Sequence, residues 1–265
     1  MQKIIVTSDL SERSRPAMKR AVALAQASGA TLIVLSVVND DVPDALAQPV
    51  VVGAKSILTD QLKEDAGGLP LRSEIQVTLG DPLAVIGEAV ASSGADLLVM
   101  GKHRRRAFLD QIRETTMEHI IRSSRLPVLL VTTEGAEPYH NVLSGVAYSD
   151  NCTSVLHALP KVAPDADVTL FHAHDVSFRA EAERDFETWK TIHRLPEDTP
   201  LPVFFEGRPQ DAIDALMRAK PYDLLAIGGH TRADGGRYFV GRLTANLIRT
   251  PPCDLLIAKS PAKTA

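Results

Sequence analysis

A glycine followed by a run of cations is the part of this sequence whose residue types most directly suggest chemistry. Gly101 follows the apolar run ADLLVM and precedes Lys102, His103 and three arginines. Cations just after a strand can bind phosphate, but a loop whose backbone N–H groups surround phosphate usually needs several glycines. Residues 102–116 contain none. The stretch is therefore a working nucleotide site, a former one whose glycine stays because the strand turns sharply there, or a basic patch for another partner.

The pattern around this glycine occurs twice. The run GDPLAVIGEAVASSGADLLVMGKHRRR from Gly80 aligns with GRPQDAIDALMRAKPYDLLAIGGHTRA from Gly207, at an offset of 207 − 80 = 127. The starts, KIIVTSD and VLSGVAYSD, align Asp9 with Asp150 at an offset of 150 − 9 = 141. The chain is therefore predicted to hold two copies of one unit, residues 1–134 and 141–260, the second shorter by 141 − 127 = 14 residues in its middle.

Each copy alternates short apolar runs with helical patterns. In the first copy we expect strands at 3–8, 31–38, 73–80, 96–100 and 127–133, and helices at 11–29 (capped by Ser11), 54–66, 82–94 and 110–124. This alternation predicts an α/β fold, a doubly wound parallel sheet with helices on both faces. In the second copy Pro196, Pro200 and Pro202 precede the third strand, so its second crossover should contain less helix.

Several of these motifs resemble the universal stress protein family. They are IIVTSDLSERSRPAMKRA, GDPLAVI, ADLLVMG and RLPVLLV in the first copy, and GRPQDAI, YDLLAIGG and PPCDLLIA in the second. The resemblance implies two five-stranded units, Rossmann-like and similar to adenine nucleotide alpha hydrolases. It also implies that they pack face to face through their last strands as an internal pseudo-dimer. It further implies a stress-response regulatory role without catalysis.

ATP-binding members of this family hold the nucleotide with the loop Gly-x-x-Gly, nine residues, Gly-Ser/Thr, and other members lack that loop and do not bind ATP. In the first copy Gly101 matches, Arg104 and Glu114 replace the next two glycines, and Thr115 fits the hydroxyl position. The Glu114 carboxylate would repel phosphate. The second copy matches at Gly228 and Gly241, with Thr231 and Arg242 as replacements, and it also contains Gly229, Gly235 and Gly236.

The second copy is therefore the better candidate for ATP or another adenine nucleotide, because Arg242 can contact phosphate in a bidentate way. Its predicted contacts are Gly228, Gly229, His230, Gly241 and Arg242, with Asp150 at the adenosine end. The weaker equivalents in the first copy are Asp9, Gly101, His103 and Thr115. The alternative for the second-copy glycines is a surface loop without a ligand.

The other polar candidates each have a plain structural alternative. Asp9 and Asp150 are predicted to end the first strands. The aspartate at this position contacts adenosine in ATP-binding relatives, but an aspartate there also suits a helix N-cap or the turn before it. His103 and His230 either donate to phosphate or are solvated loop residues. His172 and His174 share one strand face and precede Asp175, which suggests zinc, but no third ligand stands at a fixed spacing, and no metal is predicted.

Composition and missing motifs narrow the function. The 265 residues carry a net charge of −4 and two cysteines, which argues against a disulfide framework and for the cytoplasm. No apolar run suits a membrane span, no nucleophile or metalloprotease motif is present, and KHRRR lacks interleaved aromatic residues for nucleic acid. We expect a non-catalytic regulator that senses an adenine nucleotide through its second copy. The alternative is a nucleotide-independent adaptor for unnamed protein partners; a further homodimer stays open.

Overall fold

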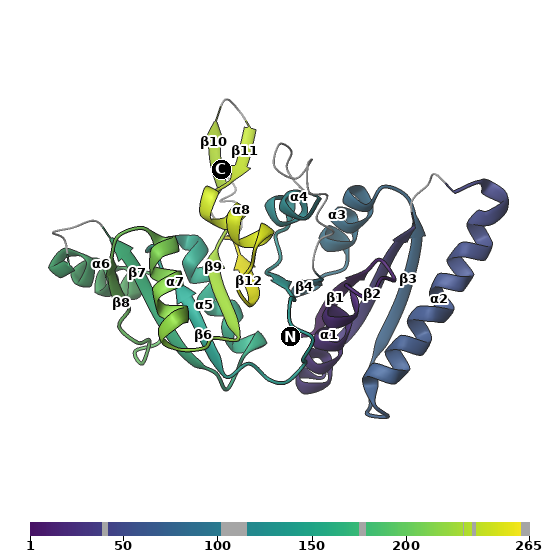
Figure 1. Ribbon diagram of the computed structural model, residues 1–265, viewed down its shortest axis with the longest axis horizontal. Coiled ribbons are helices and arrows are strands. Elements are labelled where there is room, and N and C mark those ends of the chain that lie inside the picture. Colours follow the sequence, from purple (N-terminus) through teal and green to yellow (C-terminus); the bar gives the residue numbers. More distant parts are fainter. Residues whose placement is uncertain (39–41, 102–115, 175–178, 230, 235–236, 261–265) are drawn as a thin grey trace. The chain divides into compact units, whose positions relative to one another are not determined.

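Two units of one architecture make up the chain. The computed structural model describes residues 1–38, 42–101, 116–174, 179–229, 231–234 and 237–260. Its internal contacts divide the chain into Met1–Glu137 and Pro138–Ala265. Each unit contains five parallel strands with helices on both faces (Figure 1), so the predicted α/β fold with two repeats is confirmed.

The first unit follows the order β3-β2-β1-β4-β5. Its strands are β1 (Lys3–Ser8), β2 (Thr31–Val38), β3 (Ser73–Leu79), β4 (Leu97–Met100) and β5 (Val128–Leu130). Its helices are α1 (Arg15–Ser28), α2 (Asp44–Ala66), α3 (Pro82–Ser92) and α4 (Thr116–Ser123). Helices α1 and α2 pack on each other, as do α3 and α4. Because both faces of the sheet are covered, β4 is buried along its whole length, as the continuous apolar run LLVM predicts.

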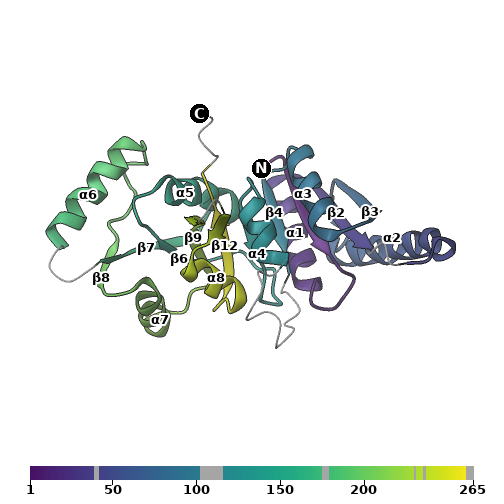
Figure 2. The same ribbon diagram turned by 90° about the horizontal axis from the view of Figure 1, so that it is seen from above.

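The second unit repeats this order as β8-β7-β6-β9-β12. Its parallel strands are β6 (Asn141–Gly145), β7 (Asp167–His174), β8 (Val203–Glu206), β9 (Leu224–Gly228) and β12 (Asp254–Ala258). Its helices are α5 (Asp150–Val162), α6 (Arg179–Ile192), α7 (Pro209–Ala219) and α8 (Arg242–Arg249). An antiparallel hairpin, β10 (Thr231–Asp234) and β11 (Arg237–Val240), connects β9 to α8. Helices α5 and α6 lie on one face of the strands and α7 and α8 on the other (Figure 2).

Two helix boundaries differ from the sequence prediction. Helix α1 begins at Arg15, because residues 11–14 form a turn in which the Ser14 N–H donates to the Ser11 carbonyl at 3.0 Å. Helix α2 begins at Asp44, ten residues before the predicted start at Ala54, and continues through Pro49. The prediction of a shorter second crossover is confirmed, since α2 has 23 residues and its counterpart α6 has 14.

Candidate functional site

The candidate site of each unit lies where the strand order reverses. In the first unit β1 has β2 on one side and β4 on the other, and in the second unit β6 lies between β7 and β9. Ligands of open α/β sheets bind in the crevice outside the carboxyl ends of the strands at such a point. Asp9 and Gly101 directly follow β1 and β4, and Gly228 ends β9.

Strand pairing sets the equivalence of the two units and corrects the alignment of their first strands. Ile4 pairs with Leu97 and Val142 pairs with Leu224. Since Leu97 and Leu224 are equivalent at 224 − 97 = 127, the offset of the first strands is 142 − 4 = 138. Leu10 and Tyr148, both with positive φ, share this offset. Ala147 (9 + 138), and not Asp150, is therefore the counterpart of Asp9.

The same register corrects the size and place of the gap. Lys3 pairs with Thr31 and Asn141 with Asp167, so the second strands are offset by 167 − 31 = 136. The second unit has therefore lost 138 − 136 = 2 residues before its second strand and 136 − 127 = 9 before its third. The total is 11 residues and not 14, because the sequence alignment placed the first strands three positions apart from their true register.

Asp9 organises the turn that precedes α1. Its Oδ1 accepts from the Ser11 N–H at 3.0 Å and from the Ser11 hydroxyl at 2.6 Å. Burial alone would raise the pKa of the Asp9 carboxyl, but the hydrogen bonds from Ser11 and Ser14 outweigh it, and the pKa lies below its ordinary value. Asp9 therefore has the turn role that the sequence left open, and it also presents a carboxylate beside the switch point of the first unit.

Asp150 occupies a different place from Asp9. It is the first residue of α5, after the N-cap Ser149, and it does not end β6. Its Oδ1 lies 3.7 Å from Nε2 of His193, and its side chain is 45% exposed. A carboxylate in the first turn of a helix is stabilised by the helix dipole. The place of Asp150 in the first turn of α5 therefore explains an aspartate at this position without a ligand.

Gly101 and Gly228 allow a close approach of two backbones. A Cβ atom on Gly101 would lie 2.8 Å from the carbonyl oxygen of Arg13, and one on Gly228 would lie 3.0 Å from the backbone nitrogen of Cys152. Neither glycine has a positive φ. The expectation that the strand turns sharply at Gly101 stays a prediction, because the residues that follow it lie outside the described part of the chain. Close packing gives a separate reason for this glycine, since Arg13 and Ser14, directly before α1, lie against the end of β4.

The backbone of Gly229 is already used within the second unit. Its N–H donates to the carbonyl of Ala258 at 2.8 Å, and its carbonyl accepts from Nδ2 of Asn151 at 3.1 Å. Oδ1 of Asn151 in turn accepts from the Ser260 N–H at 2.8 Å. These bonds connect the ends of β9 and β12 to the start of α5, so the Gly229 N–H does not point to an open phosphate site.

The remaining second-unit candidates stand around the hairpin. Strand β10 begins three residues after Gly228, and Thr231 pairs with Val240 directly before Gly241. Gly241 is the N-cap residue of α8, and the side chain of Arg242 at the start of that helix is exposed. Between the two matching glycines, Thr231–Asp234 thus pairs with Arg237–Val240. Some of the predicted residues lie outside the described part of the chain: Lys102, His103, Arg104, Glu114, Thr115, Asp175, His230, Gly235 and Gly236.

Aromatic side chains pack together beyond the carboxyl end of β6, where the sequence predicts the adenosine contact. The Tyr148 ring stacks on His172 with 4.3 Å between centroids and 11° between planes, and its hydroxyl donates to the carbonyl of Ala182 at 2.9 Å. Phe186 and Trp189 pack against Tyr148 from α6. Nδ1 of His172 lies 2.8 Å from the carbonyl oxygen of Val146. Burial lowers the pKa of His172, although this hydrogen bond opposes the shift.

The sequence analysis missed this aromatic cluster, although one signal was available. The chain has 1 + 4 + 7 = 12 aromatic residues, Trp, Tyr and Phe together, and only Phe108 precedes Glu137. This imbalance indicates that the second unit builds its core from rings. It does not indicate which rings meet, because Tyr148, His172 and Trp189 come from three different elements.

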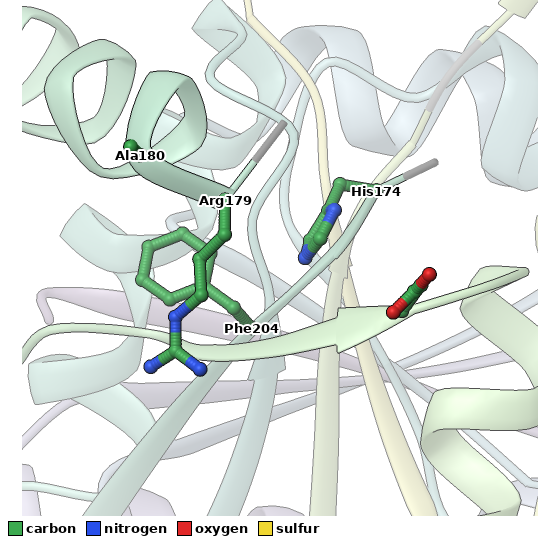
Figure 3. A pocket seen from close by; sticks show the side chains of 5 residues that line it. His174, Arg179, Ala180 and Phe204 are labelled. Atoms are coloured by element: carbon green, nitrogen blue, oxygen red, sulfur yellow. The ribbon is translucent and has the colours of Figure 1, made fainter. Parts of the chain in front are cut away.

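A pocket of about 350 Å³ lies farther out, at the carboxyl ends of β7 and β8. His174, Arg179, Ala180, Phe204 and Glu206 line it. Arg179 stands beside the ring of Phe204, and His174 faces them across the hollow (Figure 3). None of the predicted nucleotide contacts lines this pocket. His172 and His174 do share a strand face with rings 6.3 Å apart, but no three His, Cys, Asp or Glu side chains in the described part of the chain could hold a metal.

Comparison with known proteins identifies the family. The model of the universal stress protein family matches residues 1–132 and 138–259. The chain belongs to the universal stress protein family. This membership supports a stress-response role. No curated protein matches the chain. Among the described residues, no helix is long and apolar enough to cross a membrane.

Solved structures agree with this fold over both units. A universal stress protein from Archaeoglobus fulgidus matches with a TM-score of 0.77 at 16% identity, over 98% of each chain. A protein of unknown function from Pseudomonas aeruginosa PAO1 matches at 0.69 and 18%, over 98% of this chain and 93% of that one. A putative universal stress protein from Pseudomonas aeruginosa UCBPP-PA14 gives 0.68 and 19%, with the same coverage. At these identities the likeness shows the fold alone.

Proposed function

We propose that this universal stress protein is a cytoplasmic regulator that acts by binding and not by catalysis, and that its second unit works without a nucleotide, as an adaptor for protein partners. The observation that carries the proposal is the change of side chains just after β6. There Ala147 stands in the position of Asp9, and Tyr148 packs on His172. A methyl group cannot accept a hydrogen bond from a ribose or an adenine.

The backbone of the second unit supports the same conclusion. Phosphate binding needs several unpaired N–H groups that converge on one point. The Gly229 N–H donates to Ala258, and the hairpin pairs Thr231 with Val240. Nucleotide sensing through Gly228, Gly241 and Arg242, which the sequence favours, would require these contacts to open. Asp150 would contribute little to adenosine from its place at the start of α5.

A second candidate function is sensing of an adenine nucleotide such as ATP through the first unit. The observation that favours it is Asp9, whose carboxyl is ionised at neutral pH beside the switch point. Its carboxylate suits a ribose hydroxyl, next to the close-packed Gly101. His103 and Thr115 are the further contacts that this candidate requires. Hydrolysis would be slow, because nothing in the described residues activates a water.

Calorimetry with ATP on the 265-residue chain tests whether the second unit works without a nucleotide and whether the first unit binds one. We expect Gly241→Glu and Asp150→Asn to leave the heat of binding at the wild-type value, and Asp9→Ala to remove any binding that the wild type shows. Gly241 has an ordinary φ of −56°, so a side chain there introduces charge without backbone strain. Binding abolished by Gly241→Glu and unchanged by Asp9→Ala would overturn the proposal and assign the nucleotide to the second unit.

A further inference from the structure

The first nine residues of α2 after Asp44 are not part of the core. No residue from Ala45 to Gly53 is buried, although most are apolar. Leu46 is 54% exposed, Val50 38% and Ile57, about one turn beyond Gly53, 48%. The contrast lies within the same helix, because Ala54, Leu58 and Leu62 are buried at 4%, 0% and 6%.

The crossover that contains this part of α2 is longer than its counterpart in the second unit. The counterpart crossover is nine residues shorter by strand register (136 − 127), and α6 has 14 residues against 23. The early part of α2 also has a poor sequence for a free helix. It contains Pro49, three consecutive valines and Gly53, all of which favour helix less than alanine does. Helices of this kind owe their stability to packing of an apolar face.

The exposed apolar positions have the spacing of a helix-pairing seam. Leu46, Val50, Gly53 and Ile57 follow one another at intervals of four, three and four residues. This is the a/d spacing at which two helices interlock side chains. A Cβ atom on Gly53 would have nothing within 4 Å, so Gly53 leaves an open depression in the seam. Asp60 and Glu64 then occupy the next two positions, which ends the seam at Ile57.

We propose that α2 pairs in antiparallel orientation with α2 of a second copy of this chain. About a two-fold axis, Leu46 meets Ile57 of the partner subunit (46 + 57 = 103) and Val50 meets Gly53 of the partner subunit (50 + 53 = 103). Each valine then fills a depression left by a glycine. A parallel pair would instead place glycine on glycine and leave a void.

Charge and contact area both bear on the pairing of α2 with a second copy. No charged residue stands between Asp44 and Lys55, so no like charges oppose each other at the centre of the seam. Three half-exposed aliphatic side chains per copy bury far less than the roughly 800 Å² per partner of a standard stable interface. The pair is therefore weak, with a dissociation constant on the order of 10–100 μM.

Sedimentation velocity of the full chain from about 1 μM to about 1 mM spans this range. We expect the wild type to pass from monomer to dimer, and Val50→Asp to weaken the dimer by at least about tenfold. Val52→Asp is the matched control: Val52 is 63% exposed but lies two residues, about 200°, farther round the helix. A wild type that stays monomeric overturns the proposal, and so does a dimer that Val50→Asp leaves intact or that Val52→Asp weakens equally.

Cysteine cross-linking tests the orientation separately. The native Cys152 and Cys253 are buried and do not interfere. A mixture of Leu46→Cys chains with Ile57→Cys chains should form the mixed disulfide well above the amount of either homodimer. Preferential coupling of Leu46→Cys with itself would indicate a parallel pair. Guanidinium unfolding of each variant checks that these exposed substitutions leave the fold intact. A monomeric chain destabilised by Val50→Asp would mean that its own residues cover the seam, which also overturns the proposal.

Discussion

At the carboxyl end of their first strands, the two units have the same backbone and different side chains. Leu10 and Tyr148 both adopt positive φ, which is uncommon for residues other than glycine. Gly101 lies against Arg13 and Ser14, directly before α1, and Gly228 lies against Asn151 and Cys152 in the first turn of α5. Yet Asp9 in one unit becomes Ala147 in the other, and Leu10 becomes a tyrosine that stacks on His172.

This difference separates what the fold requires from what a ligand would require. The glycines and the left-handed residues are fixed by contacts within each unit, so their presence is no evidence of a nucleotide. The Asp9 carboxylate and the rings around Tyr148 also make contacts within their own units, but these side chains differ between the units. Function in such a fold must therefore be argued from the side chains at the switch point.

The largest effect is expected in the aromatic cluster of the second unit. Phe186 is 0% exposed, and Phe186→Ala should lower the free energy of unfolding of that unit by about 3–5 kcal/mol. Trp189 is the one tryptophan of the chain, so its fluorescence reports the second unit while circular dichroism reports both. Ile192→Ala on the same helix, at a side chain 68% exposed, is the control and should stay within about 0.5 kcal/mol. Equal losses in both variants would show that the rings do not stabilise the unit as a cluster.

Sequence reasoning succeeded where the apolar runs are continuous. Short continuous apolar runs such as LLVM and LLAIG are typical of buried strands in a parallel sheet, and both form such strands. It was wrong at the first strand of the second unit, because SD occurs at 8–9 and again at 149–150 while strand pairing sets a register three residues away. It began α2 at Ala54, although the helix begins at Asp44 and includes Pro49 and the three valines. The contact of Tyr148 with His172 depends on tertiary packing, which no local pattern encodes.

A smaller effect is expected from a methyl group at the shared glycine. Gly101→Ala would place Cβ 2.8 Å from the carbonyl oxygen of Arg13, a backbone atom that cannot move cheaply. We expect a loss of about 1–3 kcal/mol in the free energy of unfolding of the first unit, measured in urea. Gly228→Ala should cost less in the second unit, since its nearest contact is 3.0 Å.

Gly87→Ala in α3 is the control for these two variants. A Cβ atom there meets nothing within 4 Å, so the change should stabilise the helix by about 0.5–1 kcal/mol. Should Gly101→Ala prove as harmless as Gly87→Ala, the close approach of α1 to β4 would not explain why glycine stands at the loop, and a ligand contact would become the better explanation.

The smallest expected effect is a difference in acid sensitivity between the units. Burial, followed by the nearby His174, lowers the pKa of His172 below its ordinary 6.5, against the opposing hydrogen bond to Val146 and the charge of Asp185. As the pH falls below 6.5, the unfolded chain therefore binds a proton before the folded one does. The free energy of unfolding of the second unit should fall from pH 6.5 until the folded pKa is passed. Asp9 in the first unit, whose pKa is lowered, affects stability only below pH 3.8, where its stabilising contribution is lost as the carboxyl is protonated.

Denaturation at neutral and mildly acidic pH, followed by Trp189 fluorescence, tests this difference. The plot of unfolding free energy against pH should be flatter for His172→Phe and like the wild type for the exposed His157→Gln. A profile that stays steep in His172→Phe would assign the acid sensitivity of the second unit to another group.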